Sequence, residues 1–171
     1  MSRTLKRNVP TSSEGILQTI KISFEIRAAA ELGRLSVTTQ DEFGRVQSLN
    51  SVRVVLLSSG VNEITTPGNP YEPVRVFSPA KKDPPSGGVL NLRMDLWPFN
   101  LQPVIVELID QEGKSLGLRV ISVNHLNPQM VETTIPYEIA EPVSARLTIR
   151  QDDDRIAGLV YVYTQEVLLN P

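Results

Sequence analysis

The chain has 171 residues, of which 40% are hydrophobic and 21% charged, and its formal net charge is −2. This composition fits one or two globular domains and is too apolar for intrinsic disorder. It argues against a nucleic-acid surface, because binding phosphates requires a clustered basic excess.

The chain contains no cysteine and a single histidine. It therefore has no disulfide, no thiolate metal site and no cysteine nucleophile, and we expect no cofactor. No apolar run approaches the roughly 20 residues of a membrane span. The basic residues Arg3, Lys6 and Arg7 precede no apolar segment of the kind found in a signal peptide. The chain is then either cytosolic or a piece of a longer exported protein.

The first 58 residues predict a flexible arm followed by three strands. Residues 1–15 are polar and form the arm. In residues 16–26 the apolar side chains alternate with polar ones, which is the period of a half-buried strand. Residues 28–32 are interpreted as a connection of at most one helical turn. Strands are expected at residues 34–40 and 51–58, joined by a turn that contains Gly44.

Residues 59–73 separate two strand-rich regions. The segment holds three prolines and two glycines. Because proline fixes its own φ and restricts the preceding residue, we expect a semi-rigid domain linker here.

The remaining residues, 74–171, predict about seven short strands with frequent turns and no helix. Residues 89–96 alternate cleanly, with Leu90, Leu92, Met94 and Leu96 on the inner side. Residues 104–110 carry apolar side chains on both sides and predict a central strand. In residues 115–123 the apolar phase shifts after Val120, which indicates a β-bulge. Pro136 makes the strand at residues 133–139 an edge strand. This pattern predicts an all-β, antiparallel, two-sheet sandwich.

The end of the chain repeats its beginning. The segment starting at Ile22 aligns with the one starting at Ile135, Arg34-Leu-Ser-Val37 with Arg146-Leu-Thr-Ile149, and Val55-Leu-Leu57 with Val167-Leu-Leu169. The offsets of 110 to 113 residues are about the size of one small β-sandwich. We therefore expect residues 16–58 to be the second half of a unit that is complete in residues 74–171.

Several short motifs in the complete unit occur in an order that resembles one family. They are Val74-Arg-Val-Phe-Ser-Pro79, Gly88-Val-Leu90, Trp97-Pro-Phe99, the stretch from Val106 to Leu116, and Ile135-Pro-Tyr-Glu138. Together they resemble the immunoglobulin-like domain of bacterial spore germination proteins and of related exported lipoproteins. The resemblance implies a non-catalytic β-sandwich module in an exported, envelope-associated protein, with no catalytic or ligand residues to transfer.

Three groups of side chains are candidates for chemistry. Trp97 and Phe99, with Tyr71, form either an aromatic patch for a glycan or peptide, or a plug at one end of the sandwich. Asp152, Asp153 and Asp154 form either a weak calcium site or a solvated hairpin tip. His125 lies in a loop without the motif of a hydrolase nucleophile. The favoured hypothesis is a structural or protein-interaction module, with a carbohydrate-binding module as the alternative.

The partial unit also predicts a partner. Residues 16–58 carry an apolar face but lack the strands that would cover it, and exposed strand edges associate readily. We expect a homo-oligomer, formed either by pairing two partial units or by laying the partial unit on a complete one.

Overall fold

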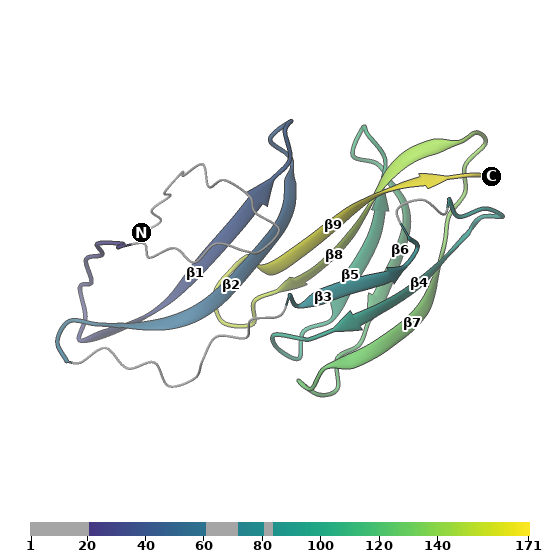
Figure 1. Ribbon diagram of the computed structural model, residues 1–171. Helices are drawn as coiled ribbons and strands as arrows, with labels where there is room; N and C mark the ends of the chain where they lie inside the picture. The colour runs from purple at the N-terminus through teal and green to yellow at the C-terminus, as the bar shows by residue number, and fades with distance from the viewer. Residues whose placement is uncertain (1–20, 61–71, 81–83) are drawn as a thin grey trace.

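The structure, a computed structural model, describes residues 21–60, 72–80 and 84–171. These residues form nine strands in two antiparallel sheets and contain no helix, so the predicted all-β, two-sheet architecture is confirmed (Figure 1). No described segment is therefore a helix that could cross a bilayer. The strands are β1 (Ala30–Gln40), β2 (Val46–Leu57), β3 (Val74–Ser78), β4 (Val89–Leu96), β5 (Val104–Ile109), β6 (Ser115–Ile121), β7 (Gln129–Pro136), β8 (Val143–Asp152) and β9 (Leu159–Leu169).

Seven of these strands, β3 to β9, make the sandwich. The small sheet has the order β3-β4-β7, and the large sheet has the order β1-β2-β9-β8-β5-β6. All buried hydrophobic side chains among the described residues lie between Val74 and Leu169. The hydrophobic core therefore lies entirely within residues 74–171. Strands β1 and β2 extend the large sheet at one edge and bury no core residue.

The alternation in β4 has the expected effect. Leu90, Leu92, Met94 and Leu96 are at most 2% exposed, whereas Asn91 and Arg93 face solvent. Burying each such leucine contributes about 1.5–3 kcal/mol to folding. The prediction of the inner face of this strand is confirmed.

The central position expected for residues 104–110 is also confirmed, since β5 pairs with both β6 and β8. The bulge expected after Val120 is wrong. The β5–β6 pairing is regular from Val104 opposite Ile121 to Leu108 opposite Gly117, and it shifts only between Leu108 and Ile109. The shift lies beside the tight turn through Gly113, where the two strands must be brought together.

The two sheets meet along one side of the sandwich, where edge strand β6 of the large sheet approaches edge strand β7 of the small sheet. A Cβ atom added at Gly117 would lie 2.5 Å from the carbonyl oxygen of Pro136. Arg119 donates to the Thr134 carbonyl oxygen through Nε and Nη2, at 2.9 and 2.7 Å. The missing side chain of Gly117 thus lets the two sheets approach, and Arg119 joins them.

Two expectations for the first part of the chain are wrong. Residues 21–26 are not a strand, and Phe24 is 56% exposed, because no described strand runs beside them to accept their hydrogen bonds. The connection expected at residues 28–32 is shorter, since β1 already begins at Ala30, where it pairs with Leu57. Residues 1–15, the first part of the predicted strand at 16–26, and most of the linker lie outside the described residues.

Candidate functional site

The feature that sets this chain apart from a simple sandwich is the junction between the β1–β2 hairpin and strand β9. Three residue pairs form it: Ser48 with Tyr163, Leu49 with Val162, and Asn50 with Tyr161. In Figure 1 the hairpin extends beyond the sandwich, and no strand of the small sheet lies over it. Three pairs are few for a stable contact between strands, so other interactions must hold the hairpin in place.

One end of this pairing is held by the turn between β8 and β9. Arg34 and Arg53 are directly opposite each other in the hairpin, and both reach Asp153. Arg34 Nη1 lies 3.3 Å from Asp153 Oδ2, and Arg53 Nε lies 3.2 Å from Asp153 Oδ1. Arg53 Nη2 donates to both Asp153 and Asp154. We name Arg34, Arg53, Asp153 and Asp154 the first ionic cluster.

Asp153 is the centre of the first ionic cluster, because its side chain is fully buried. Burial alone raises the pKa of its carboxyl. Hydrogen bonds from Arg53 and from the backbone amides of Arg155 and Ile156 outweigh burial and lower the pKa from 3.8 to about 2. Two arginines opposite each other would repel, and the carboxylate between them removes that cost. Arg34 also donates to the carbonyl oxygen of Ala157 at 3.2 Å.

Phe99 belongs to the same end of the junction. The guanidinium of Arg53 lies over its ring, 4.8 Å from the ring centroid, which is a cation–π contact. The loop that carries Phe99 is held by the buried side chain of Gln151. Its Oε1 accepts from the Phe99 amide at 2.9 Å, and its Nε2 donates to the carbonyl oxygens of Asn100 and Gln102 at 3.0 and 2.6 Å. The surface that Arg53 meets is therefore shaped by the sandwich itself.

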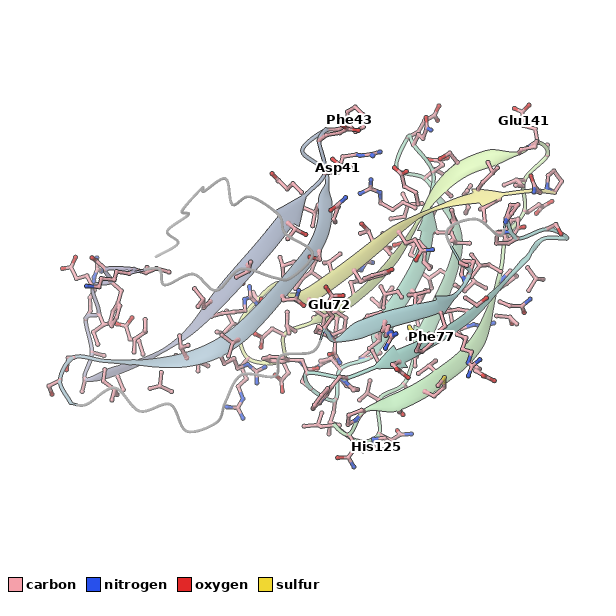
Figure 2. The ribbon with its side chains drawn as sticks, viewed as in Figure 1. Asp41, Phe43, Glu72, Phe77, His125 and Glu141 are labelled. Carbon is pink, nitrogen blue, oxygen red and sulfur yellow. The ribbon has the colours of Figure 1, made fainter. Side chains whose placement is uncertain are left out.

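The other end of the pairing is held by a second ionic cluster, which consists of Asp41, Arg45, Arg146 and Glu166. Asp41 lies in the turn of the hairpin (Figure 2), and its Oδ2 accepts from Arg45 Nε at 2.6 Å and from Arg146 Nη2 at 3.4 Å. Arg45 Nη2 lies 2.8 Å from Glu166 Oε1. Burial raises the pKa of Asp41, but hydrogen bonds from Arg45 outweigh burial and lower it.

Backbone carbonyl oxygens at the start of β2 also bind side chains of β8 and β9 at this end of the pairing. Arg146 Nη1 donates to the carbonyl oxygen of Val46 at 3.1 Å, and Thr164 Oγ1 donates to Val46 and Gln47 at 3.2 and 3.1 Å. Strands β8 and β9 of the sandwich thus bind the start of β2 through side chains as well as through backbone pairing.

The predicted aromatic patch is not assembled as an exposed surface. Trp97 and Phe99 are both half-buried, Phe99 packs against the core, and Tyr71 lies outside the described residues. The Trp97 amide donates to the carbonyl oxygen of Pro73 at 2.8 Å. More exposed rings occur at Phe77, between Arg75 and Arg93, and at Phe43 in the hairpin turn (Figure 2).

The acidic triplet is divided between solvent and the junction. Asp152 is exposed, whereas Asp153 and Asp154 bind arginines, so the expectation of a solvated tip is wrong at Asp153. In residues 21–60, 72–80 and 84–171, no three His, Asp or Glu side chains are grouped so that they could hold a metal ion. His125 is exposed in the β6–β7 loop (Figure 2).

The hollows among the described residues are small or open. One cavity of about 10 Å³ lies between β2, β9 and the start of β3 and is lined in part by Tyr161. The buried hydroxyl of Tyr161 has no hydrogen-bond partner among the described residues. The cavity has room for about one water molecule. An open depression on β4 and β7 is lined by Ser78, Asn91, Arg93 and Glu132 among others. Neither has the shape of a small-molecule site.

No protein-family model matches this sequence, and no curated protein is significantly similar to it. The junction is therefore the feature of the molecule that bears on function. Sequence reasoning missed Arg34 and Arg53 because their acidic partners lie about a hundred residues away, as Arg53 and Asp153 do. The available signal was an arginine in each of the two strands of the first hairpin, Arg34 and Arg53, together with an acidic turn in the other half of the repeat.

Proposed function

We propose that this chain is a non-catalytic, immunoglobulin-like structural and protein-interaction module that couples a preceding partial unit to a complete sandwich. The single observation that carries the proposal is the addition of the β1–β2 hairpin to the edge of β9, with an ionic cluster at each end of the three-pair contact. Strand addition at a sheet edge is a recurring way of joining two β structures.

The energetics favour a defined junction over a loose tether. Exposed ion pairs contribute about 0–1 kcal/mol each. The Asp153 carboxylate is different, because its side chain is buried and it accepts from two arginines and two backbone amides. Removing one hydrogen-bond partner of a buried polar group costs about 1–3 kcal/mol. These contacts favour a docked hairpin over a freely moving one.

The immunoglobulin-like assignment and the export of the protein are supported by two observations. Strands β3 to β9 divide into three and four, as in the smaller immunoglobulin-like sandwiches. The ordered motifs from Val74 to Glu138 resemble those of exported bacterial envelope proteins. Fractionation of the source cells with an antibody to residues 84–171 tests the location: we expect the envelope fraction, and recovery in the cytosol alone would overturn this part of the proposal.

The alternative, glycan binding through Trp97, Phe99 and Tyr71, has less support. Stacking on a sugar requires an open ring face, and one face of Phe99 is covered by Arg53. Trp97 is half-buried at the end of β4. A glycan array tests the alternative directly, and binding that is lost in Trp97→Ala would restore it.

The coupling role is tested by releasing the hairpin. In Arg53→Ala we expect the amides of β1 and β2 to exchange hydrogen roughly tenfold faster, because an isolated hairpin is marginally stable in water. Amides of β8 should keep their protection. The matched control is Arg155→Ala, since Arg155 is exposed in the same turn and contributes its backbone amide rather than its side chain. Unchanged exchange in Arg53→Ala would refute the coupling.

A further inference from the structure

Among the strands that the structure describes, β1 leaves one edge of the large sheet without the usual protection. Of the edge strands, β3 has only five residues and β7 ends in Pro136. At β6, Arg119 joins the edge to β7. Strand β1 is 11 residues long and contains no proline and no lysine. Proline and short length are two of the devices that prevent edges from pairing, and β1 has neither.

Both charged side chains of β1 are also engaged elsewhere. Arg34 points to Asp153, and Glu31 Oε1 accepts from the Arg27 amide at 2.8 Å. Neither is directed along the free edge to repel an incoming strand.

The pairing pattern shows which backbone groups face outward. The Ser58 amide donates to the Ala29 carbonyl oxygen at 3.1 Å, so Ala29 and Ser58 form a hydrogen-bonded pair. In an antiparallel ladder such pairs alternate with pairs that do not hydrogen-bond to each other. The residues whose N–H and C=O groups point away from β2 are therefore Ala30, Leu32, Arg34, Ser36 and Thr38.

One side of the hairpin continues the inner face of the sandwich. Asn50 is opposite Tyr161, which is 2% exposed, and residues directly opposite share a side of the sheet. By alternation, Val52, Leu35 and Val37 lie on the same side. They are 48%, 44% and 63% exposed, and we name these three residues the open face.

We infer that β1 pairs antiparallel with β1 of a second copy of this chain, about a two-fold axis that sets Leu35 opposite its counterpart. The two large sheets then join into one. The inference rests on the proposed function, since it needs a docked hairpin. An antiparallel strand edge is complementary to itself, so two copies satisfy each other's outward backbone groups in an isologous contact.

The register follows from charge and pairing. With Leu35 on the axis, Arg34 is opposite Ser36 and Leu32 is opposite Thr38, and all four residues present outward backbone groups. Moving the axis to Arg34 would set two arginines opposite each other, which is unfavourable. The net charge of −2 per chain opposes the approach of two copies only weakly. The axis through Leu35 also brings the two open faces together on one side of the joined sheet.

A single cysteine tests this geometry, because the chain has none. Residues opposite each other in a non-hydrogen-bonded pair have Cα atoms about 4.5 Å apart, within the range of a disulfide. We expect Leu35→Cys to form a covalent dimer under mild oxidation. Val55→Cys and Val120→Cys are controls on the neighbouring strand and at the other sheet edge, and both side chains are more than half exposed. They should remain monomers on a non-reducing gel.

The outcome separates this pairing from other contacts between copies. Sheets packed face to face lie about 10 Å apart, too far for a disulfide between two Leu35→Cys residues. A dimer in solution without this cross-link would therefore overturn the edge pairing. A cross-link through Val120→Cys alone would place the contact at β6 and would also overturn it.

A second pair of variants keeps the test independent of cysteine chemistry. Thr38→Pro removes one N–H group from the outer edge of β1. The hydrogen bonds from β1 to β2 remain, since the backbone N–H and C=O groups of Thr38 point away from β2. By sedimentation we expect its dimer dissociation constant to rise at least about tenfold, which is roughly 1.4 kcal/mol, and that of Thr38→Ala to change little.

A wild-type chain that is monomeric at about 100 μM would refute the inference. We expect a specific pairing to have a dissociation constant below that concentration, so that dimers would be populated. If hydrogen exchange in Arg53→Ala still shows release of the hairpin, the proposed coupling function stands while the dimer does not. If neither effect is seen, both fail.

Discussion

The β1–β2 and β8–β9 hairpins have similar sequences and very different surroundings. Both are long, antiparallel and joined by a tight turn, and the first strand of each carries Arg-Leu followed by a β-branched pattern, from Arg34 and from Arg146. Leu147 and Ile149 are fully buried, whereas no residue of β1 or β2 is buried. The pattern of a strand is local, but its burial depends on the neighbours that the rest of the chain supplies.

The neighbours of the second hairpin can be identified. Strand β5 pairs with β8, and the small sheet covers the inner face through side chains such as Leu92 and Ile135. The first hairpin has β9 along three pairs and no described strand on its other edge. The comparison shows how an edge and a face that form a core in one unit become interaction surfaces in the other.

The largest expected effect contrasts the two aligned leucines. Leu147→Ala should lower the free energy of unfolding by about 2–5 kcal/mol, because it leaves a cavity in a packed core. Leu35→Ala should change it by less than about 0.5 kcal/mol in the monomer, because Leu35 is 44% exposed. Chemical denaturation at low protein concentration measures both. Equal effects would mean that the hairpin has a core of its own.

A smaller difference is expected for two glycines in strands. Gly117→Ala should destabilise by about 1–3 kcal/mol, because the new Cβ would meet the Pro136 carbonyl oxygen at 2.5 Å and the backbone must shift. Gly33→Ala in β1 would meet a side-chain carbon of Val54 at 3.3 Å. A side chain can adjust, and alanine reduces the entropy of the unfolded chain, so the net change there should be within about 0.5 kcal/mol.

Thermal unfolding measures the same difference between the two glycine variants. The melting temperature of Gly117→Ala should fall by several degrees while that of Gly33→Ala stays close to the wild-type value. A tolerated Gly117→Ala would show that the two sheets can separate locally at β6 and β7.

The strands that were predicted correctly are those whose alternating apolar residues are buried by a neighbouring sheet. Strand β4 alternates between buried and exposed positions, as the alternation of its sequence predicts. The segment with Ile22 and Phe24 also alternates, yet it is not a strand, because a strand requires a partner and a periodic sequence does not supply one. Tertiary context decided between the two cases.

The junction could not be predicted for a different reason. Its contacts join Arg53 to Asp153 and Phe99, residues far apart in the sequence, and the β2–β9 register involves only three pairs. The acidic turn and the aromatic motif were recognised separately as candidates. Nothing in their local spacing indicates that an arginine from another hairpin lies between them, since only the folded sheet brings the three together.

The smallest expected effect is a dependence of the junction on pH. The pKa of Asp153 is about 2 in the folded chain, below its ordinary value of 3.8, so the ionised carboxylate stabilises the docked hairpin above about pH 4. This stability should be lost as the pH falls from about 4 towards 2, by about 1–2 kcal/mol, because protonation removes the charge that holds the arginines. Asp41, whose pKa is also lowered, should act in the same direction.

Hydrogen exchange of β1 and β2 amides between pH 5 and pH 2, corrected for the intrinsic pH dependence of exchange, measures this loss. Amides of β5, which pairs with β8 on one side and β6 on the other, serve as the reference within the same molecule. Asp153→Asn should loosen the hairpin already at pH 5 and reduce its further response to acid, since the amide cannot titrate and does not neutralise two arginines. If the hairpin of the wild-type chain keeps its protection at pH 2 relative to β5, the buried carboxylate does not hold it. The difference between the two hairpins would then have to lie in the short backbone pairing with β9.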